Sequence, residues 1–147
     1  MGTRGLIKII CKKRIMYSYN SCDSYHFGLG RDLVMEIISI INEHGLKWFI
    51  KHVSKIEYIS YPKTTSNKRK PYTQGSIKEM IKAGYIYDMG YREPITNDIE
   101  YLYVIDLDKK YFYLDGCEKF SIESLPKNLY SMEWCDENFK TVSQTTG

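Results

Sequence analysis

Residues 17–32 read YSYNSCDSYHFGLGRD, and along this stretch a strand pattern gives way to a helix pattern. Alternating tyrosines lead into small polar residues, and Gly28-Leu29-Gly30 then precedes an amphipathic segment. The order predicts a strand, a loop over residues 23–31 and a helix. Because loops between regular elements often carry working side chains, this loop is the first candidate site.

A hairpin is expected before this loop. Residues 4–11 and 14–19 have the composition of β-strands, with Lys12-Lys13 between them as the tip. This tip lacks the Gly or Asn that tight hairpin turns prefer.

Two helices are expected directly after the loop. Residues 33–43 carry a wide apolar stripe, Asp32 suits the N-cap position and Gly45 suits the C-terminal end. A second helix with the same pattern is expected from residue 46 to about 56.

A short helix and a strand meander are expected in the second half. Ser76 and Glu79 have the spacing of a capping box, and Gly84 ends the helix that they begin. Residues 99–107 are apolar on both faces, which is typical of a central strand, and turn residues then separate two further short strands that end near residue 122.

The composition agrees with one globular domain. The chain has 147 residues, of which 43% are hydrophobic and 27% charged. The expected fold class is α+β: a mostly antiparallel sheet, made of the N-terminal hairpin and the C-terminal meander, covered by two or three helices. The expected domain spans residues 1–147, with residues 141–147 as a frayed tail.

The sequence predicts a protein of the cytoplasm, with the nucleus as the alternative. No apolar run is long enough to cross a bilayer, and the N-terminus lacks a signal-peptide pattern, so no membrane partner is expected. The four cysteines are far apart, so neither a metal site nor a cofactor is expected, and Cys11 and Cys117 are interpreted as buried thiols.

Charge is divided unevenly along the chain. Residues 1–92 hold 16 Lys and Arg against 7 Asp and Glu, whereas residues 93–147 hold 5 against 11. The N-terminal part is therefore expected to present a basic surface and the C-terminal part an acidic one.

Residues 3–5 and 19–30, which include part of the loop of residues 23–31, resemble the motifs of a protein family. The chain resembles an uncharacterised family of short proteins from large DNA viruses, fungi and some bacteria. The matching positions are Thr3, Arg4, Gly5, Tyr19, Asn20, Asp23, Ser24, Tyr25, Gly28, Leu29 and Gly30. His26 stands where the family usually has Pro, and residues 101–113 look like its second landmark, a strand that ends in Asp-Leu-Asp. The resemblance implies a shared domain and, with the many Ile, Lys, Tyr and Asn residues, a giant virus as the source; it implies no established activity.

The favoured function is a non-enzymatic module that binds a ligand or a protein partner through this loop. Backbone N–H groups at the glycines, the following helix N-terminus and two arginines would suit a small anionic ligand. The expected ligand-binding residues are Arg4, Asn20, Asp23, Ser24, Tyr25, Gly28, Gly30 and Arg31. In the structural interpretation of the same residues, Asp23 caps a turn and the glycines only form the bend.

Three other functions stay open. A small hydrolase- or transferase-like enzyme could act on an anionic substrate at the same loop, where Cys22, Asp23 and His26 are neighbours, although no catalytic residue is assigned. Nucleic acid could bind the basic loop of residues 63–72, but this function is not favoured. A protein partner could dock on an exposed tyrosine surface. The nucleic-acid candidates are Lys68, Arg69, Lys70 and Tyr72, and the tyrosine surface comprises Tyr85, Tyr87 and Tyr91.

Overall fold

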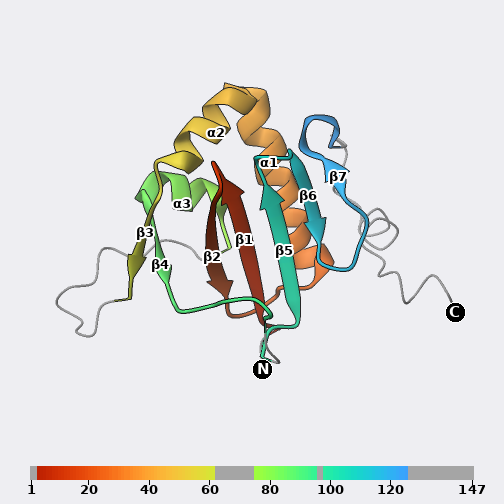
Figure 1. Cartoon of the computed structure of the whole chain (residues 1–147). Coiled ribbons are helices and arrows are strands. Elements are labelled where there is room, and N and C mark those ends of the chain that lie inside the picture. The colour runs from red at the N-terminus through yellow and green to blue at the C-terminus, as the bar shows by residue number, and fades with distance from the viewer. Residues whose placement is uncertain (1–2, 62–74, 96–97, 126–147) are drawn as a thin grey trace, which may run out of the picture.

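The protein is described by a computed structural model, which covers residues 3–61, 75–95 and 98–125 (Figure 1). Three α-helices and seven strands lie within these residues and form an α+β fold, as the sequence predicts. The basic loop of residues 63–72 and the tail of residues 141–147 lie outside the described ranges.

A five-stranded sheet forms the centre of the molecule. Its strands run in the order β2-β1-β5-β6-β7, with β1 and β5 parallel and all other neighbours antiparallel. The hairpin and the meander are therefore confirmed, and the parallel pairing of β1 with β5 joins them. Their bounds are β1 (Gly5–Cys11), β2 (Arg14–Asn20), β5 (Tyr101–Asp106), β6 (Tyr111–Leu114) and β7 (Phe120–Ser121).

A second, two-stranded sheet was not expected from the sequence. It pairs β3 (Glu57–Ser60) with β4 (Tyr85–Asp88) in parallel, beside β2 (Figure 1). The Tyr17 backbone N–H of β2 donates to the Tyr58 hydroxyl at 3.2 Å, so a side chain occupies part of the β2 edge. Strands of four residues are too short to show a clear period of two, which is why the pattern missed them.

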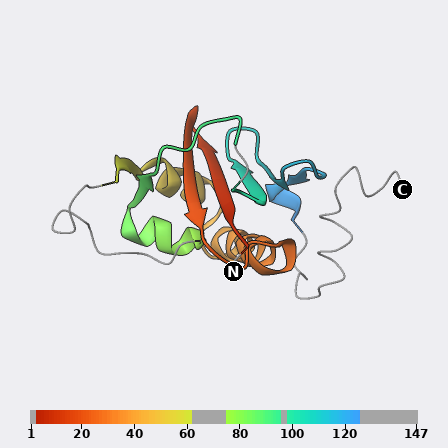
Figure 2. The same ribbon diagram turned by 90° about the horizontal axis from the view of Figure 1, so that it is seen from below.

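The helices pack against one face of the large sheet. They are α1 (Arg31–His44), α2 (Leu46–Ser54) and α3 (Ile77–Ala83), and Figure 2 shows α1 lying across the sheet. Ser76 caps α3 by accepting the Glu79 N–H at 3.2 Å, and Gly84 follows its last turn with φ +80°. The apolar stripe of α1 is buried as predicted: Leu33, Val34, Ile37 and Ile40 are at most 3% exposed.

The expected N-cap at Asp32 is wrong, because the helical path begins earlier. His26–Gly30 form a π-helical turn that runs directly into α1. Gly30 has helical dihedral angles (φ −58°, ψ −49°), and Asp32 lies within the first turn of α1. Gly28 and Gly30, which were expected to lie in a loop, therefore belong to the helical turn that precedes α1.

The opposite face of the sheet is crossed by the connection from β4 to β5 (Figure 2). Glu93 in this connection pairs with Lys8 of β1 at 2.6 Å, and Tyr91 stacks on Tyr19. Burial, together with the Glu93 carboxylate, raises the pKa of Tyr17 to about 12, so its hydroxyl keeps its proton at neutral pH.

The expected tyrosine surface does not form. Tyr85 is only 3% exposed, and Tyr87 and Tyr91 are half-buried. Tyr85 and Tyr87 contact each other edge to face, so these rings mainly pack the small sheet and the crossing connection.

Within the described ranges, no helix has both the length and the apolar character to cross a membrane.

The hairpin tip explains how two lysines can occupy a tight turn. Lys12 and Lys13 have φ values of +51° and +66°, a combination that tight hairpin turns require and that usually selects Asn and Gly. The Asp108 carboxylate accepts both of their backbone N–H groups, at 2.6 and 2.8 Å. A side chain from the β5–β6 turn thus holds a strained turn of the first hairpin.

Replacing Asp108 with Ala should lower the free energy of unfolding by about 2 kcal/mol, because two N–H groups lose a charged acceptor. Adding Lys13→Gly should restore about 1 kcal/mol by relieving the left-handed strain. Urea unfolding of the three proteins measures both effects. Asp115→Ala, at another exposed aspartate, is the matched control and should change stability by less than about 0.5 kcal/mol. Equal stability of Asp108→Ala and the parent would contradict the role of this carboxylate.

Candidate ligand-binding cleft

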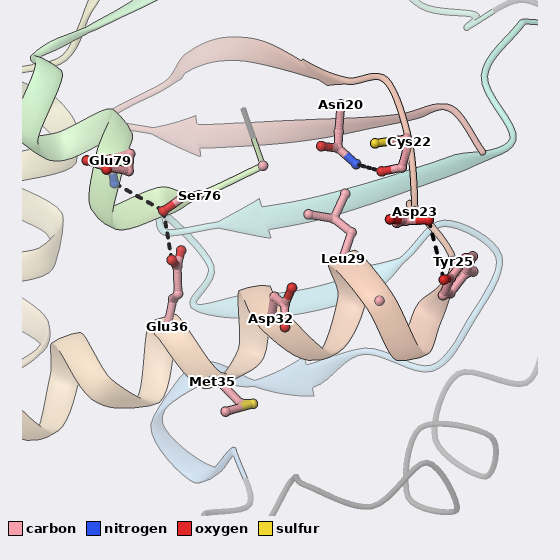
Figure 3. Close-up of a pocket in the computed structure, with 12 residues that line it drawn as sticks. Asn20, Cys22, Asp23, Tyr25, Leu29, Asp32, Met35, Glu36, Ser76 and Glu79 are labelled. Carbon is pink, nitrogen blue, oxygen red and sulfur yellow. Dashed lines mark hydrogen bonds between the residues drawn. The ribbon is translucent and has the colours of Figure 1, made fainter. Parts of the chain in front are cut away.

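An open cleft of about 680 Å³ lies between the loop after β2, the first half of α1 and the N-terminus of α3 (Figure 3). Two of these segments are consecutive in the sequence, and the fold brings the distant start of α3 against them. Its lining residues are Asn20, Cys22, Asp23, Tyr25, Gly28, Leu29, Asp32, Met35, Glu36, Gly75, Ser76 and Glu79.

A network of hydrogen bonds holds the loop after β2 in place at one end of the cleft. Ser24 is fully buried, and its Oγ accepts from Asn20 Nδ2 at 2.8 Å. Asn20 Nδ2 also donates to the Cys22 carbonyl at 2.5 Å. The Ser24 carbonyl accepts from the Tyr103 hydroxyl at 2.6 Å. Asn20 and Ser24, both expected to bind ligand, thus shape the loop through their contacts within the chain.

The glycines allow close packing instead of offering N–H groups to an anion. The N–H groups of Gly28 and Gly30 donate to the Tyr25 carbonyl at 3.0 and 3.4 Å, and that of Leu29 donates to the Asp23 carbonyl at 3.0 Å. A Cβ at Gly30 would lie 2.9 Å from Tyr103 Cε1. The N–H groups of Gly28, Leu29 and Gly30 therefore already have acceptors within the chain, so these glycines do not offer the free donors expected for an anion.

Asp23 and Tyr25 are two polar side chains of the motif that line the cleft, together with Asn20 and Leu29. Asp23 is exposed and has φ +55°, which its short polar side chain tolerates better than most. The Tyr25 hydroxyl donates to Asp23 Oδ1 at 3.4 Å (Figure 3). The nearby Asp23 carboxylate raises the pKa of Tyr25, so this phenol remains a neutral hydrogen-bond donor.

The other end of the cleft is closed by a contact between two helices. Glu36 of α1 accepts from Ser76 Oγ at 2.7 Å and from the Ile77 N–H at 2.6 Å (Figure 3). The carboxylate therefore satisfies N–H groups that the first turn of α3 leaves unpaired. Asp32 lies between this contact and Asp23 along the wall that α1 provides.

The charge in this cleft is opposite to that of the surrounding sequence. Residues 1–92 contain seven acidic residues, and four of them line the cleft: Asp23, Asp32, Glu36 and Glu79. Of the 16 Lys and Arg in the same part, the 12 that the structure describes contribute none of the lining residues. The arrangement therefore favours a positively charged ligand over the small anion expected from the sequence.

The two arginines expected at the site lie elsewhere. Arg4 is exposed just before β1, and Arg31 is half-buried at the first position of α1. Neither lines the cleft with Asp23 and Tyr25. His26 is also not among the lining residues, so the structure does not bring Cys22, Asp23 and His26 together there.

The acidic wall was missed because it depends on two helices meeting. Asp32 and Glu36 are four residues apart, so they share one face of α1, and this spacing was visible in the sequence. Nothing in the sequence pattern showed that Ser76 and Glu79 would face them.

The nucleic-acid candidates Lys68, Arg69, Lys70 and Tyr72 lie outside the described residues. Within residues 3–61, 75–95 and 98–125, no three His, Cys, Asp or Glu side chains are grouped to hold a metal ion.

The fold and the cleft together define an α+β protein with an acidic cleft beside its central sheet. Comparison of the chain with protein-family models, curated proteins and solved structures gave no match. The resemblance carried by residues 19–30 therefore stays a prediction.

Gly30→Ala should lower the free energy of unfolding by about 2 kcal/mol, although Ala normally favours a helix over Gly. The reason is the new Cβ, which would press on the Tyr103 ring and disturb its hydrogen bond to Ser24. In a Tyr103→Phe background the same substitution should cost less, because the crowded hydroxyl is gone. Chemical denaturation of the four proteins gives this cycle, and a stabilising Gly30→Ala would contradict the close approach.

Proposed function

We propose that this protein is a binding module whose cleft receives a positively charged group, either on a small molecule or on a side chain of a partner protein. The observation that carries the proposal is the gathering of Asp23, Asp32, Glu36 and Glu79 around one cavity, to whose lining no Lys or Arg of the described residues contributes. Charges of one sign along a concave wall concentrate ligands of the opposite sign.

The cleft also has an apolar part, which points to an organic cation. Tyr25, Leu29 and Met35 line it next to the carboxylates. An aromatic ring adds attraction for an ammonium or guanidinium group that lies over its face. A guanidinium suits the site well, because its planar donors can engage two carboxylate oxygens at once.

Asp23 and Asp32 are the residues proposed to bind the cation. Both are exposed, whereas the Glu36 carboxylate already accepts hydrogen bonds from Ser76 and Ile77. The Tyr25 hydroxyl lies 3.4 Å from Asp23 Oδ1 and helps to hold this carboxylate in place. The proposal keeps the loop of residues 23–31 as the binding element but reverses the charge of its ligand.

Titration with the amides of N-acetyl-arginine, N-acetyl-glutamine and N-acetyl-glutamate tests this proposal by NMR. We expect the arginine amide to shift backbone signals of residues 20–36 and 75–79, and the other two to leave them unchanged. Asp23→Asn together with Asp32→Asn should weaken arginine binding about tenfold, which corresponds to about 1.4 kcal/mol. Asn also tolerates the positive φ of Asp23, so the loop should keep its shape.

Glu118→Gln provides the matched control, since Glu118 is exposed on the turn after β6 and lies outside the cleft. This variant should bind the arginine amide like the parent. Stronger binding of the glutamate amide, or an arginine affinity that the double substitution leaves unchanged, would reject the proposed cation site.

A further inference from the structure

A second concave surface lies where the end of α1 meets α2 and α3. It is a groove of about 300 Å³ lined by Ile40, Glu43, His44, Trp48, Lys78, Ile81 and Lys82. Ile40 is 3% exposed and Ile81 is half-buried, so the floor is apolar. None of its lining residues belongs to the acidic cleft.

Trp48 in this groove is stacked between two histidine rings. The His44 ring stacks on the Trp48 ring with their centroids 3.9 Å apart. The His52 ring also stacks on Trp48, with a centroid distance of 3.8 Å. His52 Nδ1 lies 2.9 Å from the Trp48 carbonyl oxygen, which can only accept, so Nδ1 carries the hydrogen. A tryptophan whose orientation is fixed before binding loses little conformational entropy when a partner packs on it.

Two lysines border this apolar floor, and three others are exposed along α2. Lys78 and Lys82 are exposed on α3 four residues apart and line the groove. Lys47, Lys51 and Lys55 are exposed along α2 and its C-terminal end. Among the described residues that line the groove, Glu43 is the single carboxylate, and its Oε2 lies 3.6 Å from His44 Nε2.

We infer that this groove is a docking site for an acidic segment of a partner protein that places an apolar side chain against Trp48. The lysines complement acidic residues of such a segment, and Ile40, Ile81 and the Trp48 edge provide the pocket for its anchor. A nucleic acid would use the lysines but has no comparable apolar anchor, so the protein segment fits the groove better. This inference is independent of the cation site proposed above.

Fluorescence anisotropy with labelled peptides tests the inference on the full chain. The probe is an amphipathic peptide of about twelve residues with Leu and Phe four positions apart among Glu and Asp. In one comparison peptide Gln and Asn replace the acidic residues, and in the other Lys replaces them. An oligothymidylate tests whether the groove binds nucleic acid. We expect the acidic peptide to bind at about 100 μM and the other three probes to bind at least about tenfold more weakly.

Charge reversal on α3 locates this binding. The pair Lys78→Glu and Lys82→Glu, on exposed positions, should weaken the acidic peptide at least about tenfold. Lys119→Glu is the matched control and should not weaken it, because Lys119 is exposed directly before the edge strand β7 and does not line the groove. The inference is overturned if the acidic peptide fails to bind, if its affinity ignores the α3 lysines, or if oligothymidylate binds there more tightly. Self-association of the chain that the α3 reversal abolishes would instead assign the groove to a second copy.

Discussion

The hydrogen bond from the Tyr103 hydroxyl to the Ser24 carbonyl, 2.6 Å long, ties the central strand to the start of the helical layer. The Tyr103 side chain is completely buried between the sheet and the helices. A buried phenol needs a partner, and here the partner is the backbone of the loop that leads into α1. Gly30 leaves the space that lets the helix approach this ring. The position of α1, and with it one wall of the cleft, depends on this contact.

The same few residues explain why the cleft is acidic while its surroundings are basic. The hydrogen-bond network of the loop uses Asn20 and Ser24, and Asp23 and Tyr25, with Cys22, face the cleft. On α1, the apolar stripe faces the sheet, which turns Asp32 and Glu36 toward the loop and α3. Burial of the apolar residues thus determines which polar residues form the cleft. Charge along the sequence could not show this, because it averages residues that the fold separates.

Much of the fold could be predicted from local patterns, and most of the site could not. The capping box at Ser76, the glycine at position 84 and the apolar stripe of α1 act within a few residues, so the sequence shows them directly. The lysine hairpin tip looked unfavourable because its support, Asp108, lies about a hundred residues away. The anion site was inferred from glycines and arginines that are neighbours in sequence. In the structure the glycine N–H groups are satisfied within the chain, and the arginines do not line the cleft.

The formation of α3 depends on the contact that Glu36 of α1 makes with its first turn. With seven residues, α3 is too short to be stable by itself, and its first turn relies on a carboxylate that belongs to α1. The proposed cation binds Asp23 and Asp32 and leaves the Glu36 contact in place, so it would meet a complete cleft only when α3 is formed. On this binding mode, occupation of the cleft and formation of α3 would be thermodynamically linked, with an equal effect in both directions. Since α3 also forms one rim of the groove at Trp48, the two faces of this short helix share one folding equilibrium.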